Sequence, residues 1–139
     1  MRRLRYDAPM TRRALLLASL ALAALPAFTA AVAGPAKTLK GQVVCGGCWD
    51  EVADRKKDPY GTKADLECAA KCEKNGVAAA LAVEEGKDFR LYELAPGAFK
   101  PEGRGWLKYI GKRVEATGSV DDAAKKPRFT VDALKVVEK

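Results

Sequence analysis

Residues 113–120 read RVEATGSV, and this stretch decides the fold class. Small or apolar residues alternate with polar ones here, at positions Val114, Ala116, Gly118 and Val120. A period of two residues is typical of a β-strand with one buried face and one solvated face. We therefore expect a strand at 113–120 and a domain whose core is built from sheet.

The following segment, residues 129–137 (FTVDALKVV), predicts a strand whose pattern changes along its length. Phe129, Val131 and Ala133 alternate, and the apolar positions then shift by one residue to Leu134. Such a shift requires a β-bulge or a bend, which a strongly curved sheet uses. The sequence therefore predicts a curved sheet.

Three further strands are expected toward the N-terminus. They cover residues 37–44 (KTLKGQVV), 77–83 (VAAALAV) and 89–94 (FRLYEL). The glycine at position 86 lies in the short link between the last two segments, so we expect them to form a hairpin.

Two helices fit between these strands. Thr62 and Asp65 approximate a capping box, and Gly76 suits the end of the helix that follows them. A shorter helix carries Trp106 and Tyr109 and ends before Gly111.

This order predicts a mostly β domain with two short helices. A helix between the third and fourth of five strands matches the OB-fold, a small five-stranded barrel. The cysteine-bearing helix is then an insertion between strands 1 and 2. A generic small α+β domain is the alternative.

The N-terminal residues 1–33 are expected to be a signal peptide, cleaved before Gly34. Five arginines precede an apolar stretch that begins at Ala14, and Ala31-Val32-Ala33 supplies a small-x-small cleavage site. The apolar stretch is short for a transmembrane helix, so no stable membrane anchor is expected after cleavage. Residues 34–139 then form a single OB-like domain, periplasmic or secreted from a bacterium. Neither the export route, general or twin-arginine, nor the choice of start between Met1 and Met10 follows from these residues.

The positive charge of the chain lies largely in this signal. The formal net charge is +7 for the whole sequence and +3 for residues 34–139. The basic runs at 55–57 and 125–126 are flanked by aspartates and predict solvated loops. The sequence therefore argues against nucleic-acid binding, and the partner is expected to be a protein or a small ligand.

The four cysteines are the main candidate site. Cys45 and Cys48 are spaced C-x-x-C, Cys68 and Cys72 are spaced C-x-x-x-C, and the chain has no histidine. Cys68 and Cys72 lie one helical turn apart, where a disulfide between them would distort the helix. We therefore favour cross-links between the two pairs, although four cysteines permit three pairings.

The segments KGQVVCGGCW, ECAAKCEKNG and GKRVEATGSV resemble a group of small exported bacterial proteins with an OB-like barrel and cysteines after the first strand. The resemblance covers most of residues 38–137 and implies the fold and the compartment. Members of this group are mostly uncharacterised. Comparable segments often carry a histidine near the second cysteine pair, and its absence here argues against a histidine-assisted metal site.

Three functions remain open for the cysteines. Two disulfides would stabilise a small exported domain that acts as a binding or structural module, with no cofactor. Alternatively, Cys45, Cys48, Cys68 and Cys72 form a thiolate site for Zn²⁺ or Cu(I). Third, Cys45 and Cys48 form a redox-active pair, although such a motif normally starts a helix and the next expected helix lies well downstream.

The region around the first cysteine pair is also the candidate ligand rim. It comprises residues 45–58 together with Trp49 and Tyr60. With no histidine, hydrolytic triads have no support, and phosphate-cradling glycine loops are absent. No catalytic residue is therefore predicted.

Overall fold

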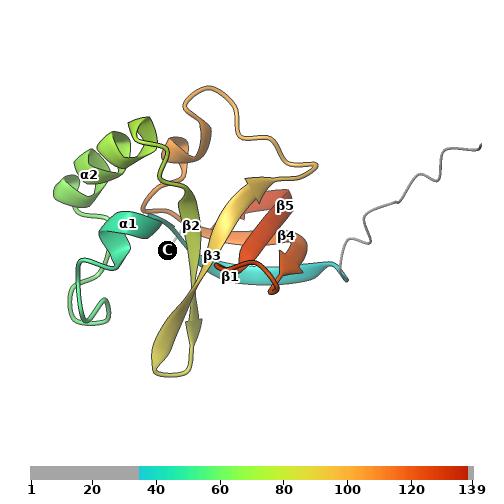
Figure 1. Cartoon of the computed structure of the whole chain (residues 1–139), viewed down its shortest axis with the longest axis horizontal. Helices are drawn as coiled ribbons and strands as arrows, with labels where there is room; N and C mark the ends of the chain where they lie inside the picture. Colours follow the sequence, from blue (N-terminus) through green and yellow to red (C-terminus); the bar gives the residue numbers. More distant parts are fainter. Residues whose placement is uncertain (1–34, 138–139) are drawn as a thin grey trace, which may run out of the picture. The chain divides into compact units, whose positions relative to one another are not determined.

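The computed structural model describes residues 35–137 (Figure 1). The expected signal peptide, residues 1–33, lies outside the described residues. Within the described residues, no helix is long and apolar enough to cross a lipid bilayer. The elements are β1 (Lys37–Cys45), α1 (Gly46–Trp49), α2 (Lys63–Lys74), β2 (Ala79–Glu85), β3 (Asp88–Pro96), the 3₁₀-helix η1 (Gly105–Lys108), β4 (Arg113–Asp121) and β5 (Arg128–Val136).

The five strands close into a barrel in the order β1-β2-β3-β5-β4. All neighbours are antiparallel except β3 and β5, which are parallel. β1 pairs with β4 up to Gln42 and with β2 from Gln42 onward. Gly41 lies at this change of partner, where a Cβ atom would collide with the carbonyl oxygen of Ala82. The expected OB-like barrel, with its cysteine-bearing insertion between strands 1 and 2, is confirmed.

The barrel core is formed by inward-facing side chains from several strands. The register places Val43 opposite Leu81, and both are fully buried. Val114, Phe129 and Val131 are 1 % exposed or less and complete this layer from β4 and β5. Because these residues alternate with polar ones along β4 and β5, the buried face is the one that the period of two predicts.

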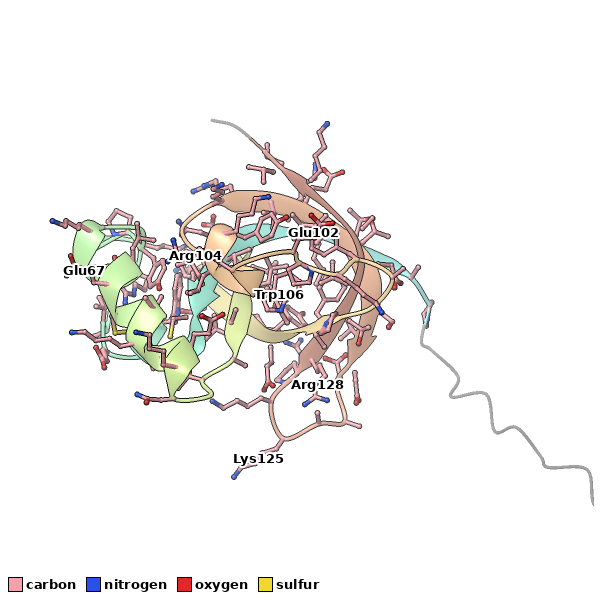
Figure 2. The ribbon with its side chains drawn as sticks, turned by 90° about the horizontal axis from the view of Figure 1, so that it is seen from above. Glu67, Glu102, Arg104, Trp106, Lys125 and Arg128 are labelled. Carbon is pink, nitrogen blue, oxygen red and sulfur yellow. A yellow bond between two sulfur atoms is a disulfide. The ribbon has the colours of Figure 1, made fainter. Side chains whose placement is uncertain are left out.

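The insertion between β1 and β2 covers the outer face of the barrel at β2. Three consecutive residues of this strand, Ala80, Leu81 and Ala82, are all buried, so both faces of the strand are covered. The Trp49 ring packs edge-on against Phe89 of β3, with 5.1 Å between ring centroids. Figure 1 shows α1 and α2 together at one end of the barrel. In Figure 2, Glu67 lies on the outer side of α2.

The bulge expected in the last strand is present. Thr117 pairs with Ala133 and Gly118 pairs with Val131, so Asp132 has no partner on β4. The Asp132 carboxylate instead accepts a hydrogen bond from the backbone N–H of Ala98 at 3.0 Å. The extra residue shifts the alternation of β5 and bends the strand around the barrel.

The start of the second strand and the form of the second expected helix differ from the sequence prediction. The second strand begins at Ala79 rather than at position 77, because the Val77 N–H donates a hydrogen bond to the Cys72 carbonyl and belongs to the end of α2. Gly76, at φ +76°, allows this reversal. The expected second helix is a single 3₁₀ turn, in which the Tyr109 N–H donates to the Trp106 carbonyl.

Candidate functional site

The four cysteines come together between the insertion and the barrel end. Cys45 is the last residue of β1, Cys48 lies in α1, and Cys68 and Cys72 lie one turn apart in α2. α1 begins directly after Cys45, whose extended backbone (φ −83°, ψ 120°) marks the change from strand to helix. The strand and the two helices therefore position all four sulfur atoms.

A disulfide joins Cys48 to Cys68. It links α1 to α2, and Cys45 and Cys72 are free thiols. One of the two expected cross-links between the pairs is therefore present, and the two α2 cysteines are not bonded to each other. The bond closes a loop with a sequence separation of 20 residues.

The two free thiols lie beside this disulfide. The Cys72 sulfur is 3.5 Å from the Cys48 sulfur, and the sulfurs of Cys45, Cys48 and Cys72 all lie within 4.8 Å of one another. Gly47 lies beside these sulfurs. A Cβ atom at this position would be 3.9 Å from the Cys72 sulfur and 4.0 Å from the Cys45 sulfur. These sulfurs lie close enough to form a different disulfide or, once the Cys48–Cys68 bond is reduced, to share a soft metal ion.

The environment of Cys72 favours its protonated form. Burial, the neighbouring Cys45 thiol and the negative charge of Glu51 each raise the pKa of Cys72. A raised pKa keeps more of the group as the neutral thiol near neutral pH.

Arg55 is the main correction to the sequence analysis, which placed it in a solvated basic loop. It is buried, and it donates hydrogen bonds to the main-chain oxygens of Cys48 and Trp49 at the end of α1. Its guanidinium lies 5.4 Å from the Trp49 ring centroid and 5.1 Å from that of Tyr60. Arg55 therefore fixes α1 by its charge, its donors and its flat surface.

Arg55 also connects α1 to α2 through Asp65. The Arg55 guanidinium lies 3.6 Å from the Asp65 carboxylate. Asp65 and Thr62 form the expected capping box, in which the Thr62 hydroxyl accepts from the Asp65 N–H and Asp65 accepts from the Thr62 N–H. Burial alone would raise the pKa of Asp65, but hydrogen bonds from Thr62 and Gly61 and the charge of Arg55 outweigh it, so the pKa is lowered.

The two aromatic residues of the expected ligand rim, Trp49 and Tyr60, are mostly buried. They are 8 % and 5 % exposed, and their ring centroids are 5.9 Å apart. The Tyr60 hydroxyl accepts a hydrogen bond from the Cys45 N–H at 3.1 Å. Burial raises the pKa of Tyr60, although the hydrogen bond from Cys45 opposes the shift. The phenol therefore stays protonated near neutral pH.

Trp49 and Tyr60 nevertheless line one cavity between the insertion and the barrel. Its volume is about 390 Å³. Phe89 contributes a third aromatic ring, and Lys40 and Arg113 contribute positive charge. Of the expected rim, Trp49, Arg55 and Tyr60 line this groove, together with barrel residues that sequence reasoning did not name. Lys40 and Arg113 lie in regular strands. Nothing in the sequence around either residue marks it as part of a site.

One premise of the redox interpretation is wrong. A short helix does begin directly after Cys45, whereas the sequence analysis placed the next helix well downstream. Cys48 is bonded to Cys68, however, so the Cys45–Cys48 bridge is not formed.

Comparison with known proteins does not assign this chain to a family or a function. No known family model, no curated protein and no solved structure matches this chain. The geometry of the cysteine centre and of the adjoining groove is therefore what indicates a function.

Proposed function

We propose that this chain is an exported, disulfide-stapled binding module whose ligand site is the groove beside Trp49 and Tyr60. One observation carries the proposal: aromatic residues of the insertion and cationic residues of the barrel line the same cavity. The Cys48–Cys68 disulfide and Arg55 hold the insertion in the position that creates this cavity.

The lining of the groove favours a small anion that carries a ring. Its positive groups include Lys40 and Arg113, and its one acidic lining residue is Glu84. Lys40 and Glu84 each have an ion-pair partner, Glu115 and Lys56. Among residues 35–137, Arg113 has no carboxylate within ion-pair distance. A guanidinium without a partner is suited to a carboxylate or sulfonate, and the aromatic wall is suited to a flat ring.

A titration with naphthalene-2-sulfonate tests this proposal. We expect the probe to shift the NMR signals of the Trp49 indole N–H and of the Tyr60 and Arg113 amides. R113Q should weaken binding about tenfold, the ratio that about 1.4 kcal/mol gives. K125Q is the matched control, because Lys125 lies at the tip of the β4–β5 loop (Figure 2). Shifts located elsewhere, or equal affinity in both variants, would contradict the groove assignment.

Export is part of the proposal because the Cys48–Cys68 disulfide persists only in an oxidising compartment. Structural disulfides are stable outside the cytosol and rare within it. N-terminal sequencing of protein recovered from the bacterial periplasm or medium should give a chain that begins at Gly34. A chain recovered from the cytosol that retains residues 1–33 would contradict export.

A thiolate metal centre is the second candidate, favoured by the three sulfurs that lie within 4.8 Å of one another. The donor set fits a soft ion such as Zn²⁺ or Cu(I), which prefers thiolate ligands. Cys45 and Cys72 would supply two thiolates, and reduction of the Cys48–Cys68 bond would free Cys48 and Cys68 to complete the ligand set. The ion would supply a structural cross-link in place of the disulfide.

Cobalt(II) provides the test of this second candidate. We would add it to the fully reduced protein without oxygen and follow the sulfur-to-cobalt charge-transfer absorption. A tetrahedral spectrum that is weakened in each of C45S, C48S, C68S and C72S would support the centre. No thiolate band, or a band unaffected by these changes, would exclude it.

A further inference from the structure

A second cavity is lined in part by Cys45, which is 3 % exposed. It has a volume of about 230 Å³ and lies between the end of α2, the start of β2 and η1. Its wall is mostly apolar and includes Ala69, Val77, Trp106, Leu107 and Ile110. Figure 2 shows Trp106 on the side of the barrel that faces α2. A neutral molecule of a few carbon atoms is suited to a cavity of this size and polarity.

Cys45 and Cys72 are available as a pair of thiols at this cavity. Cys45 lines it, and Cys72 lies within 4.8 Å of Cys45 without lining it. The disulfide between Cys48 and Cys68 leaves both groups free. The arrangement places a pair of free thiols beside the cavity, with Cys45 as the member of the pair that belongs to its lining.

We propose that Cys45 and Cys72 are a redox-active dithiol that reduces small neutral organic disulfides bound in this cavity. The Cys45 thiolate attacks one sulfur of the bound disulfide, which forms a mixed disulfide and releases the first small thiol. Cys72 then gives up its thiol proton to the departing small thiolate as its sulfur attacks the Cys45 sulfur, and the second small thiol is released. The two protons lost by the cysteines end on the two released thiols, and the protein gains a Cys45–Cys72 disulfide.

The charge at the cavity determines which disulfides enter it. Glu73 is the one acidic residue of the lining, and its carboxylate lies near the first residue of η1, 3.5 Å from the position of a Cβ atom on Gly105. A carboxylate repels an anion at this range. Neutral disulfides are therefore the preferred class, and dianionic disulfides of the same length are disfavoured.

The test uses the reduced Cys45–Cys72 form and two probes of equal chain length. Bis(2-hydroxyethyl) disulfide is neutral, and bis(2-carboxyethyl) disulfide carries two negative charges. With the neutral probe we expect two small thiols released per chain, loss of both alkylatable thiols and a Cys45–Cys72 peptide on mapping. E73Q should raise the rate with the anionic probe about tenfold relative to the neutral one.

Single cysteine variants identify the order of attack. C72S should stop at a stable mixed disulfide on Cys45, seen as an added mass of one half of the probe. C45S should not react at the cavity. A mixed disulfide that forms on Cys72 in both the unmodified protein and C45S would overturn the assignment.

A cavity variant separates binding from simple thiol exposure. A78F places a large side chain at the edge of the cavity without touching the cysteines and should slow the neutral probe about tenfold or more. A123F, in the exposed β4–β5 loop, is the control and should react normally. Equal rates in the two variants, or thiols that are inert to both probes, would overturn the proposal. Neither result would affect the ligand groove or the Cys48–Cys68 staple, because the titration and peptide mapping test those separately.

Discussion

The Arg55 guanidinium lies over the Trp49 ring, 5.4 Å from its centroid, while its Nε donates a hydrogen bond to the Trp49 main-chain oxygen at 3.2 Å. One buried side chain therefore holds both the ring and the backbone of the same residue. Its ion pair with Asp65 extends this connection to α2. The Cys48–Cys68 disulfide joins the same two helices covalently, so a polar and a covalent link act in parallel.

Replacing the buried arginine should destabilise the domain strongly. R55M keeps most of the side-chain volume but removes the buried donors to the Cys48 and Trp49 main-chain oxygens and the ion-pair partner of Asp65. We expect a loss of about 2–4 kcal/mol in the free energy of unfolding, measured by urea denaturation. The control K57M removes an exposed neighbouring charge and should change stability by less than about 0.5 kcal/mol. Equal effects of the two variants would contradict the role given to Arg55.

The disulfide partners should show non-additive effects. C48S and C68S should each lower the free energy of unfolding by about 3 kcal/mol under oxidising conditions, since the bond closes a loop of about 20 residues. The double variant C48S/C68S should lose no more than either single variant. A double variant that is far less stable than both would show that the two cysteines contribute independently.

Acid should weaken the link between the insertion helices. The pKa of Asp65 is lowered in the folded state, so its contribution to stability is complete above its unfolded value of about 3.9. That contribution is lost as the pH falls through the lower folded value. D65N should therefore be less stable than the unmodified protein at pH 7, and the difference should narrow below about pH 4. Thermal unfolding at several pH values measures this, and a difference that is constant with pH would contradict it.

Close approach of backbones makes Gly118 essential to the barrel. A Cβ atom at this position would collide with the carbonyl oxygen of Thr130 on β5. We expect G118A to cost about 1–3 kcal/mol, because neither strand can move without breaking the ladder. G46A is the matched control, since its Cβ would have no neighbour nearer than 3.6 Å. Similar melting temperatures for the two variants would be inconsistent with this packing.

Local patterns in the sequence account for most of the barrel. Alternation identified β4, and the shift after Ala133 identified a bulge that the structure places at Asp132. Both features depend on which face of the strand is buried. The order of polar and apolar residues over a short stretch of sequence shows this. The start of β2 was misplaced because Val77 is apolar, yet its N–H is used to end α2.

The site was less predictable because it depends on contacts between distant residues. Arg55 in an R-K-K run has no local feature that distinguishes it from its solvated neighbours. Arg55 is buried because the fold brings Trp49, Tyr60 and Asp65 around it. The cysteine spacing correctly indicated one link between the pairs, and the second expected link is not formed. The choice of Cys68 over Cys72 as the partner of Cys48 depends on how α2 packs against α1.

Peptide mapping of the protein, digested without reduction after free thiols are alkylated, tests directly whether Cys48 and Cys68 are bonded. We expect a cross-linked peptide that contains Cys48 and Cys68, whatever the state of Cys45 and Cys72. Four alkylatable thiols together with a bound metal ion, or a bond from Cys48 to any other cysteine, would contradict it.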